Sequence, residues 1–179
     1  MSKKLFVISG PSGAGISDIV ANVLAARSDA SRVVPVTARK RKAGEKDGVG
    51  FFFYDLEGWN ALKEAGDLLE TTEFAGNDYG TSRRLVNEKL AEGKNVLLDL
   101  DVKRAGEVKR NMPEAVCVYI EPSAEVLRER YEALSRSALE CTLRLQTARE
   151  QRELSGFCDV RICSDDLEQA AKELSALLD

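Results

Sequence analysis

The feature that most constrains this chain is a glycine-rich turn between an apolar run and an amphipathic segment. The apolar run is Leu5–Ile8, and the segment after the turn places Ile19, Val20, Val23 and Leu24 on one helical face. A strand, such a turn and a helix form a phosphate-binding loop, because glycines let backbone N–H groups crowd around an anion at a helix N-terminus. The predicted phosphate loop is Gly10-Pro11-Ser12-Gly13-Ala14-Gly15-Ile16-Ser17.

The phosphate loop lacks its usual cation. The pattern G-x-x-x-x-G-K-[ST] is complete at Gly10, Gly15 and Ser17, but Ile16 occupies the lysine position. The residue after Ser17 is Asp18, which adds a carboxylate to a helix terminus that should attract anions. We therefore expect the shape of an ATP site without its main positive charge. A plain tight turn, with Ile16 as a core residue, is the alternative interpretation.

The composition limits the classes of protein to which the chain can belong. Its 179 residues, 44% of them apolar, predict one compact domain, and a net charge of −4 argues against a nucleic-acid partner. The absence of histidine excludes histidine acid–base chemistry and most transition-metal sites. Four cysteines without C-x-x-C spacing indicate buried free thiols in a reducing compartment. The first apolar run is too short to span a membrane, so we expect a cytoplasmic protein without a membrane partner.

Apolar runs typical of buried parallel strands alternate with helical segments. The strands are expected at 5–8, 95–101, 115–120 and 159–163, and the later helices at 103–111, 124–133, 138–153 and 167–178. This alternation predicts an α/β fold with a parallel sheet flanked by helices on both sides. The stretch 35–93 departs from this alternation of strands and helices and is predicted to be an inserted subdomain. Its region is expected to hold strands at 32–37, 51–54, 68–71 and 73–75, a turn at 76–80, and helices at 56–65 and 83–91.

Several separate blocks of the sequence together resemble the guanylate kinase family. They are Ile8–Gly15, Thr37–Arg39 with Gly44-Glu45 and Asp47-Gly48, Tyr79–Arg83, Leu98–Val102 and Asp165-Asp166. The resemblance implies a P-loop core (1–34, 94–130 and 149–179), a GMP-binding insertion (35–93) and a lid (131–148). It also implies transfer of the γ-phosphate of ATP onto GMP with Mg²⁺. That reaction depends on positioning and charge neutralisation, so it needs no histidine.

The resemblance places most of a GMP site on this chain. Arg39 and Lys42 match two arginines that hold the GMP phosphate, although a lysine loses the bidentate geometry. Glu70 matches the glutamate that accepts hydrogen bonds from the guanine N1 and N2 groups. Thr81 matches a small hydroxyl residue at the base, while Pro35 replaces a serine there. The other matching positions are Phe51 (a tyrosine in the family), Tyr79, Gly80 and Asp101.

The ATP side departs from the family pattern at several places besides Ile16 and Asp18. The lid pattern Arg-x-x-Gly-Arg-Gly becomes Arg130–Arg136 without a glycine, and a paired Arg-Arg-Leu becomes Leu143-Arg144-Leu145. An Asn-Asp-Asp near the adenine becomes Ser164-Asp165-Asp166. Ser17 and Asp99 remain as candidate Mg²⁺ ligands. No residue can be given a catalytic role, and the candidates for a substitute cation are Arg136, Arg144 and Lys103.

Three functions stay open on these residues. The first is a guanylate kinase, using Mg²⁺ with ATP, that is strongly impaired or re-wired with a substitute cation. The second is a catalytically silent domain that binds GMP or a phosphorylated partner, similar to the guanylate kinase-like domains of membrane-associated scaffold proteins. The third is a kinase for a phosphorylated sugar, against which Glu70 argues. GMP is the expected ligand, with ATP if the enzyme is active. A monomer and a homodimer fit equally well, and no protein partner is indicated.

Overall fold

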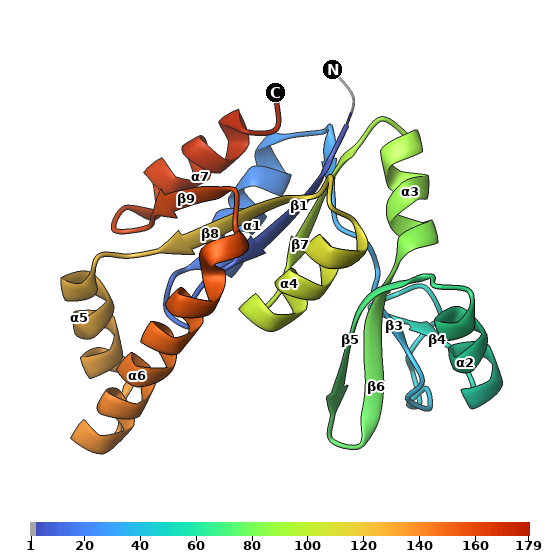
Figure 1. The fold of residues 1–179 in the computed structure, drawn as a ribbon, viewed down its shortest axis with the longest axis horizontal. Coiled ribbons are helices and arrows are strands. Elements are labelled where there is room, and N and C mark those ends of the chain that lie inside the picture. Colours follow the sequence, from blue (N-terminus) through green and yellow to red (C-terminus); the bar gives the residue numbers. More distant parts are fainter. Residues whose placement is uncertain (1–2) are drawn as a thin grey trace.

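The computed structural model describes residues 3–179, and a five-stranded sheet forms its centre (Figure 1). The strand order is β2-β7-β1-β8-β9, and every neighbouring pair is parallel. The α/β fold predicted from the alternation of strands and helices is therefore confirmed. The strands are β1 (Leu5–Ser9), β2 (Ala30–Ser31), β7 (Asn95–Asp99), β8 (Val116–Glu121) and β9 (Val160–Cys163).

Helices cover both faces of this sheet because its strands are apolar on both faces. On β1, Phe6 and Ile8 join the core beneath α1 (Ile16–Ala26) and α7 (Leu167–Ala176). Leu5 and Val7 join the opposite core, beneath α3 (Arg83–Ala91) and α4 (Val102–Asn111). Successive side chains of a strand point to opposite faces, so one continuous apolar run supplies two cores.

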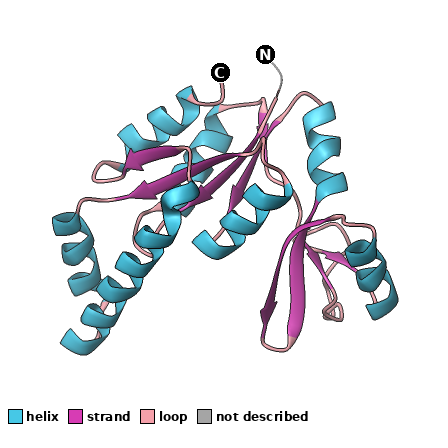
Figure 2. Ribbon diagram, viewed as in Figure 1, coloured by secondary structure: helices cyan, strands magenta, loops and turns pink. Residues whose placement is uncertain are grey.

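A second, smaller sheet lies beside the core in the order β4-β3-β6-β5 (Figure 2). The fully buried Trp59 belongs to α2, next to this sheet. Only the last two residues of the strand expected at 32–37 form β3, since Pro35 has no N–H to donate to a ladder. The elements are β3 (Val36–Thr37), β4 (Phe52–Phe53), α2 (Leu56–Glu64), β5 (Leu68–Phe74) and β6 (Asn77–Ser82).

The expected turn at 76–80 is wrong, and the correction affects the candidate site. The chain reverses at Ala75 and Gly76, which have φ angles of 50° and 71°, and β6 begins directly afterwards. The two strands expected at 68–71 and 73–75 are therefore one strand, β5, paired with β6. Because Tyr79 and Thr81 are two residues apart on β6, their side chains share one face of the sheet.

Two further helices, α5 (Ala124–Leu134) and α6 (Ala138–Leu154), lie side by side at one end of the molecule (Figure 1). Leu127, Tyr131 and Ala148 form a small core between them. A 3₁₀ turn at Ser155–Phe157 then leads into β9. Within residues 3–179, no helix is long and apolar enough to cross a membrane.

The four cysteines carry free thiols in the structure, as the spacing predicts. The expected burial is confirmed for Cys117, which lies in the interior strand β8, between β1 and β9. It does not hold for Cys163, which is exposed at the end of the edge strand β9, although Ile162 before it is buried. Cys141 and Cys158 are half-buried.

Candidate functional site

The predicted phosphate loop has the backbone shape of an anion cradle. Gly15 adopts φ 78° as the N-cap of α1, and no side chain caps the helix at that end. A Cβ built on Gly10 would lie 2.0 Å from the carbonyl oxygen of Ile120, so only glycine fits there. The first N–H groups of α1 are therefore left without a side-chain cap, in the arrangement that favours an anion.

The hollow in front of this loop is acidic. Its volume is about 490 Å³, and Asp18, Asp99 and Asp101 all line it. Ile16 also borders it, but packs against the apolar core between the sheet and α1. In the part of the chain that the structure describes, no lysine or arginine lines the hollow. Three carboxylates without a cation oppose the approach of a polyphosphate.

Ser17 and Asp99 lie together at the edge of this hollow. The Ser17 Oγ donates a hydrogen bond of 3.4 Å to Asp99 Oδ2 at the end of β7. Neighbouring protein atoms displace water from the Asp99 carboxylate and raise its pKa above the ordinary value. The charge of Arg32 and the hydrogen bond from Ser17 oppose that rise. Residues 3–179 contain no cluster of three or more acidic or cysteine side chains that would hold a metal alone. Two hard oxygen ligands fit Mg²⁺, which normally keeps waters and phosphate oxygens as its other ligands.

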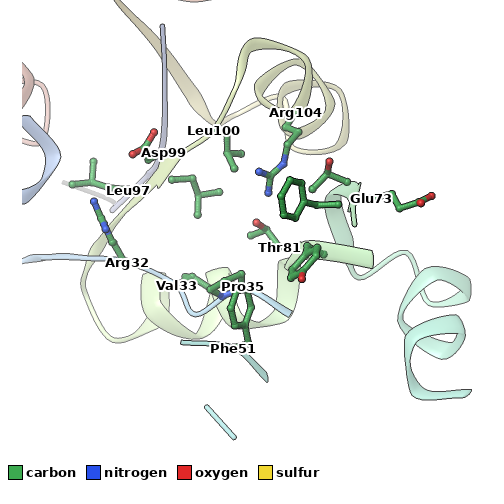
Figure 3. A pocket seen from close by; sticks show the side chains of 14 residues that line it. Arg32, Val33, Pro35, Phe51, Glu73, Thr81, Leu97, Asp99, Leu100 and Arg104 are labelled. Atoms are coloured by element: carbon green, nitrogen blue, oxygen red, sulfur yellow. The ribbon is translucent and has the colours of Figure 1, made fainter. Parts of the chain in front are cut away.

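A second cavity, of about 580 Å³, opens between the small sheet and the end of β7 (Figure 3). Phe51, Tyr79 and Thr81 line it on the side of the small sheet, and Asp99 borders both hollows. This volume is within the range of small-molecule sites. The remaining lining residues are Arg32, Val33, Pro35, Thr72, Glu73, Phe74, Leu97, Leu98, Leu100 and Arg104.

Comparisons with known proteins identify the family of the chain that forms these two hollows. The family model described as "Guanylate kinase" matches residues 2–179. The chain belongs to the guanylate kinase family. A "Guanylate kinase" of Synechococcus sp. (strain CC9311) is 39% identical over 170 residues, which cover 94% of this chain and 90% of that protein. A "Guanylate kinase" of Thermobifida fusca (strain YX) is 37% identical, over 98% of this chain and 91% of that protein.

Solved structures give the same result. The guanylate kinase from Anaplasma phagocytophilum has a TM-score of 0.66 and 26% identity, covering 99% of this chain and 85% of that chain. The shikimate kinase from Bacteroides thetaiotaomicron has a TM-score of 0.52 and 13% identity, covering 98% of each chain, and shares the fold alone. The predicted resemblance to guanylate kinases is confirmed.

Of the residues matched to the GMP site of guanylate kinases, five do not line the larger cavity: Arg39, Lys42, Glu70, Gly80 and Asp101. Arg39 donates hydrogen bonds of 2.8 and 3.1 Å to Glu45, and this pairing lowers the pKa of Glu45 to about 2. Lys42 donates its backbone N–H to Glu45 and leaves its side chain exposed. Asp101 caps α4 by accepting from the N–H groups of Lys103 and Arg104, and it lines the acidic hollow instead.

Glu70, Thr81 and Gly80 form a connected group on β5 and β6. Thr81 Oγ1 donates a 2.6 Å hydrogen bond to Glu70, which lies opposite it in the sheet. Gly80 lies between Tyr79 and Thr81, and a Cβ there would come within 2.7 Å of the Glu70 carbonyl oxygen. The Glu70 side chain is 0% exposed, so it is not among the residues that line the cavity.

The candidate substitute cations do not line the acidic hollow at the phosphate loop. Arg144 pairs with Glu140 at 2.9 Å and lies over the ring of Tyr131, with the guanidinium carbon 5.9 Å from the ring centre. Arg136 is exposed and donates its backbone N–H to Glu140. Lys103 lies at the exposed start of α4 and borders a different hollow.

Two arginines at the larger cavity were missed at the level of sequence. Arg32 extends toward Asp99, and Arg104 projects from α4 (Figure 3). Neither arginine lies in one of the family blocks. Arg104 stands three residues after Asp101 on a predicted helix, among basic residues that look like a solvated face. The only available signal was the position of Arg104, one turn beyond the end of an apolar strand where ligand sites of α/β folds gather.

Proposed function

We propose that this guanylate kinase family member binds GMP in the larger cavity and transfers phosphate from Mg·ATP only weakly. The observation that carries the proposal is the contrast between two adjoining hollows. The larger cavity has Arg32, Arg104, Tyr79 and Thr81 among its lining residues. The hollow at the phosphate loop has carboxylates and no cation among its lining residues within 3–179.

The GMP side of the proposal rests on phosphate and base contacts at two separate places. Arg39 stands beside Phe51 and Phe53, with its guanidinium carbon 5.7 and 5.3 Å from the two ring centres. Glu45 and two rings hold the guanidinium in one position, so little side-chain entropy remains to be lost on binding. A phosphate would bind the N–H groups that Glu45 does not occupy, or would displace Glu45. Thr81 lines the cavity and would supply a polar group for the base. Glu70 would do so only where its carboxylate is released from Arg104.

The ATP side of the proposal rests on charge. Mg²⁺ carried by ATP would be held by Ser17 and Asp99, and would supply neutralisation of the phosphate charge. The chain itself contributes the backbone N–H groups of the loop, but Ile16 supplies no donor to the β- and γ-phosphates. Removing one preorganised donor from a developing oxyanion costs about 10²–10³ in rate. We expect a loss of at least this size, because Asp18 also adds a like charge.

Calorimetric titration of GMP, and separately of Mg·ATP, tests this proposal. We expect a GMP dissociation constant on the order of micromolar to millimolar, as a few charged and polar contacts provide, and weaker binding of Mg·ATP. AMP is the control, because it shares the phosphate but not the guanine donor edge. Tight Mg·ATP binding without GMP binding would contradict the proposal.

A second candidate is a working kinase in which Arg32 replaces the missing lysine. The observation that favours it is the position of Arg32 beside Asp99, which borders both hollows. This arginine could therefore meet a phosphate passing between them. In this case the parent forms GDP at an ordinary rate, and Arg32→Met loses most of that rate while keeping its affinity for GMP. An Arg32→Met variant as active as the parent would exclude this candidate.

A further inference from the structure

The carboxylate of Glu70 already accepts three hydrogen bonds from the chain itself. Arg104 donates from Nε to Oε2 at 2.6 Å and from a terminal nitrogen to Oε1 at 3.0 Å. Thr81 adds a third hydrogen bond, of 2.6 Å, to Oε1. The Glu70 side chain is 0% exposed, whereas that of Arg104 is 24% exposed. A buried carboxylate needs such partners, and a bidentate guanidinium is a strong one.

The two donors of Arg104 occupy the edge of the carboxylate that a guanine would use. Guanine offers N1–H and N2–H, two parallel donors on one carbon, and this unit is itself a substituted guanidine. Nε–H and a terminal N–H of arginine have the same arrangement, and both pairs fit the two oxygens of a single carboxylate. One carboxylate edge therefore holds either Arg104 or the base, but not both.

The structure places Arg104, and not Glu70, at the wall of the cavity. Arg104 lines the 580 Å³ cavity (Figure 3). Glu70 does not line it, because its side chain is fully buried. The helix that carries Arg104 is fixed against β5 by two further bonds. The Thr71 N–H donates to Glu107 at 3.1 Å, and the Asn111 side chain donates to the Leu69 carbonyl at 2.9 Å.

We propose that Arg104 is an internal mimic of guanine that a bound base has to displace from Glu70. This inference rests on the proposed binding of GMP and adds a residue that sets its affinity and base selectivity. While Arg104 binds the two carboxylate oxygens of Glu70, the N1–H and N2–H groups of a guanine cannot reach them. The parent then distinguishes poorly between GMP and IMP, which differ only in the N2 amino group. Removing Arg104 frees the carboxylate oxygens of Glu70 and restores the preference for GMP over IMP.

The test is calorimetric titration of GMP, IMP and AMP into the parent and into Arg104→Met, which keeps an apolar stem and removes the guanidinium. We expect Arg104→Met to bind GMP about tenfold tighter than the parent, with a smaller gain for IMP and none for AMP. Arg104→Gln is the second variant, because its amide still donates one hydrogen bond to Glu70 and supports folding. Its GMP affinity should lie between the other two. Arg110→Met, an exposed arginine on the same helix, is the matched control and should behave as the parent.

Several outcomes would overturn the inference. One is equal GMP affinity in the parent, Arg104→Met and Arg104→Gln. Another is weaker GMP binding in both variants with an unchanged GMP-to-IMP ratio, which would show that Arg104 holds the ligand. A parent that already prefers GMP to IMP by about a hundredfold would show that Arg104 moves aside without cost. Failure of every variant, the parent included, to bind any of the nucleotides would instead contradict the proposed function.

Discussion

The phenolic hydroxyl of Tyr131 on α5 donates a 2.6 Å hydrogen bond to the backbone carbonyl of Ser12 in the phosphate loop. Its neighbour Arg130 donates a 2.9 Å hydrogen bond to the carbonyl of Gly13. Two side chains of one helix therefore hold the outer part of the loop by its carbonyl oxygens. These two hydrogen bonds support the loop shape without a phosphate. Because they use carbonyl oxygens, the backbone N–H groups of the loop stay available to an anion.

Replacing Tyr131 with phenylalanine should weaken this support. The ring stays buried, but one hydrogen bond is lost, and we expect the free energy of unfolding to fall by about 1 kcal/mol. Urea denaturation of the parent and of Tyr131→Phe measures the difference. An unchanged midpoint would mean that water replaces the hydroxyl at Ser12 and that the loop does not depend on α5.

Restoring the charge of the phosphate loop should restore the binding of Mg·ATP. The double variant Ile16→Lys with Asp18→Thr adds a cation and removes a like charge, so both changes favour phosphate. Each single variant should gain less, because a lysine at Ile16 can pair with the Asp18 carboxylate. Calorimetric titration of Mg·ATP into the parent, both single variants and the double variant separates these effects.

The same double variant should recover phosphoryl transfer only in part. Arg144 pairs with Glu140, and Arg136 is exposed, so we expect neither arginine to bind the transferred phosphate. Positioning accounts for much of the catalysis of phosphoryl transfer. If the double variant binds no Mg·ATP at all, the loop is not a phosphate cradle, and the loss extends from charge to shape.

Arg39→Ala and Glu70→Ala should damage ligand binding in different ways. Arg39→Ala should weaken GMP and AMP alike, by about 1–3 kcal/mol, because Arg39 is assigned to the phosphate. Glu70→Ala should remove any preference for guanine. It also leaves Arg104 without its partner, so Glu70→Gln is the variant to use if the alanine change prevents folding. Equal effects of the two changes on the GMP-to-AMP ratio would show that the base-reading assignment is wrong.

The pairing of Arg39 with Glu45 predicts a pH dependence of stability. The pKa of Glu45 falls from an ordinary value of 4.5 to about 2 in the folded chain, chiefly because of the hydrogen bonds from Arg39. A lowered pKa stabilises the fold above pH 4.5, and the stabilisation is lost as the pH falls from 4.5 toward 2. Glu45→Gln should therefore flatten the fall in unfolding free energy over this interval. Parallel curves for the parent and Glu45→Gln would contradict it.

The main sheet was predictable because its signal is local. The run Val96–Leu98 between Asn95 and Asp99 is apolar, and a strand buried on both faces has this pattern. The turn expected at 76–80 failed because Asn77, Asp78 and Gly80 are turn-forming types, yet pairing with β5 holds them in a strand. Here a tertiary contact overrides local propensity.

The candidate site was predictable only where one residue carries the signal. The backbone of the phosphate loop can be formed only with glycine at certain positions, so the spacing of the glycines in the sequence was enough to predict the loop. The contact between Glu70 and Arg104 joins residues 34 positions apart, on a strand and a helix whose docking no local pattern reveals. A basic residue on a helix is usually solvated, and only the packing of α4 against β5 shows that Arg104 is not.

The most direct test of the account is the rate at which the parent forms GDP and ADP from GMP and Mg·ATP in a coupled assay. We expect a rate at least about 10² below the 1–100 per second of ordinary kinases, because the phosphate loop lacks a preorganised donor. The variant with Ile16→Lys and Asp18→Thr should be faster than the parent. A parent that turns over at about 1–100 per second would contradict the account, since another cation would then do the work of the missing lysine.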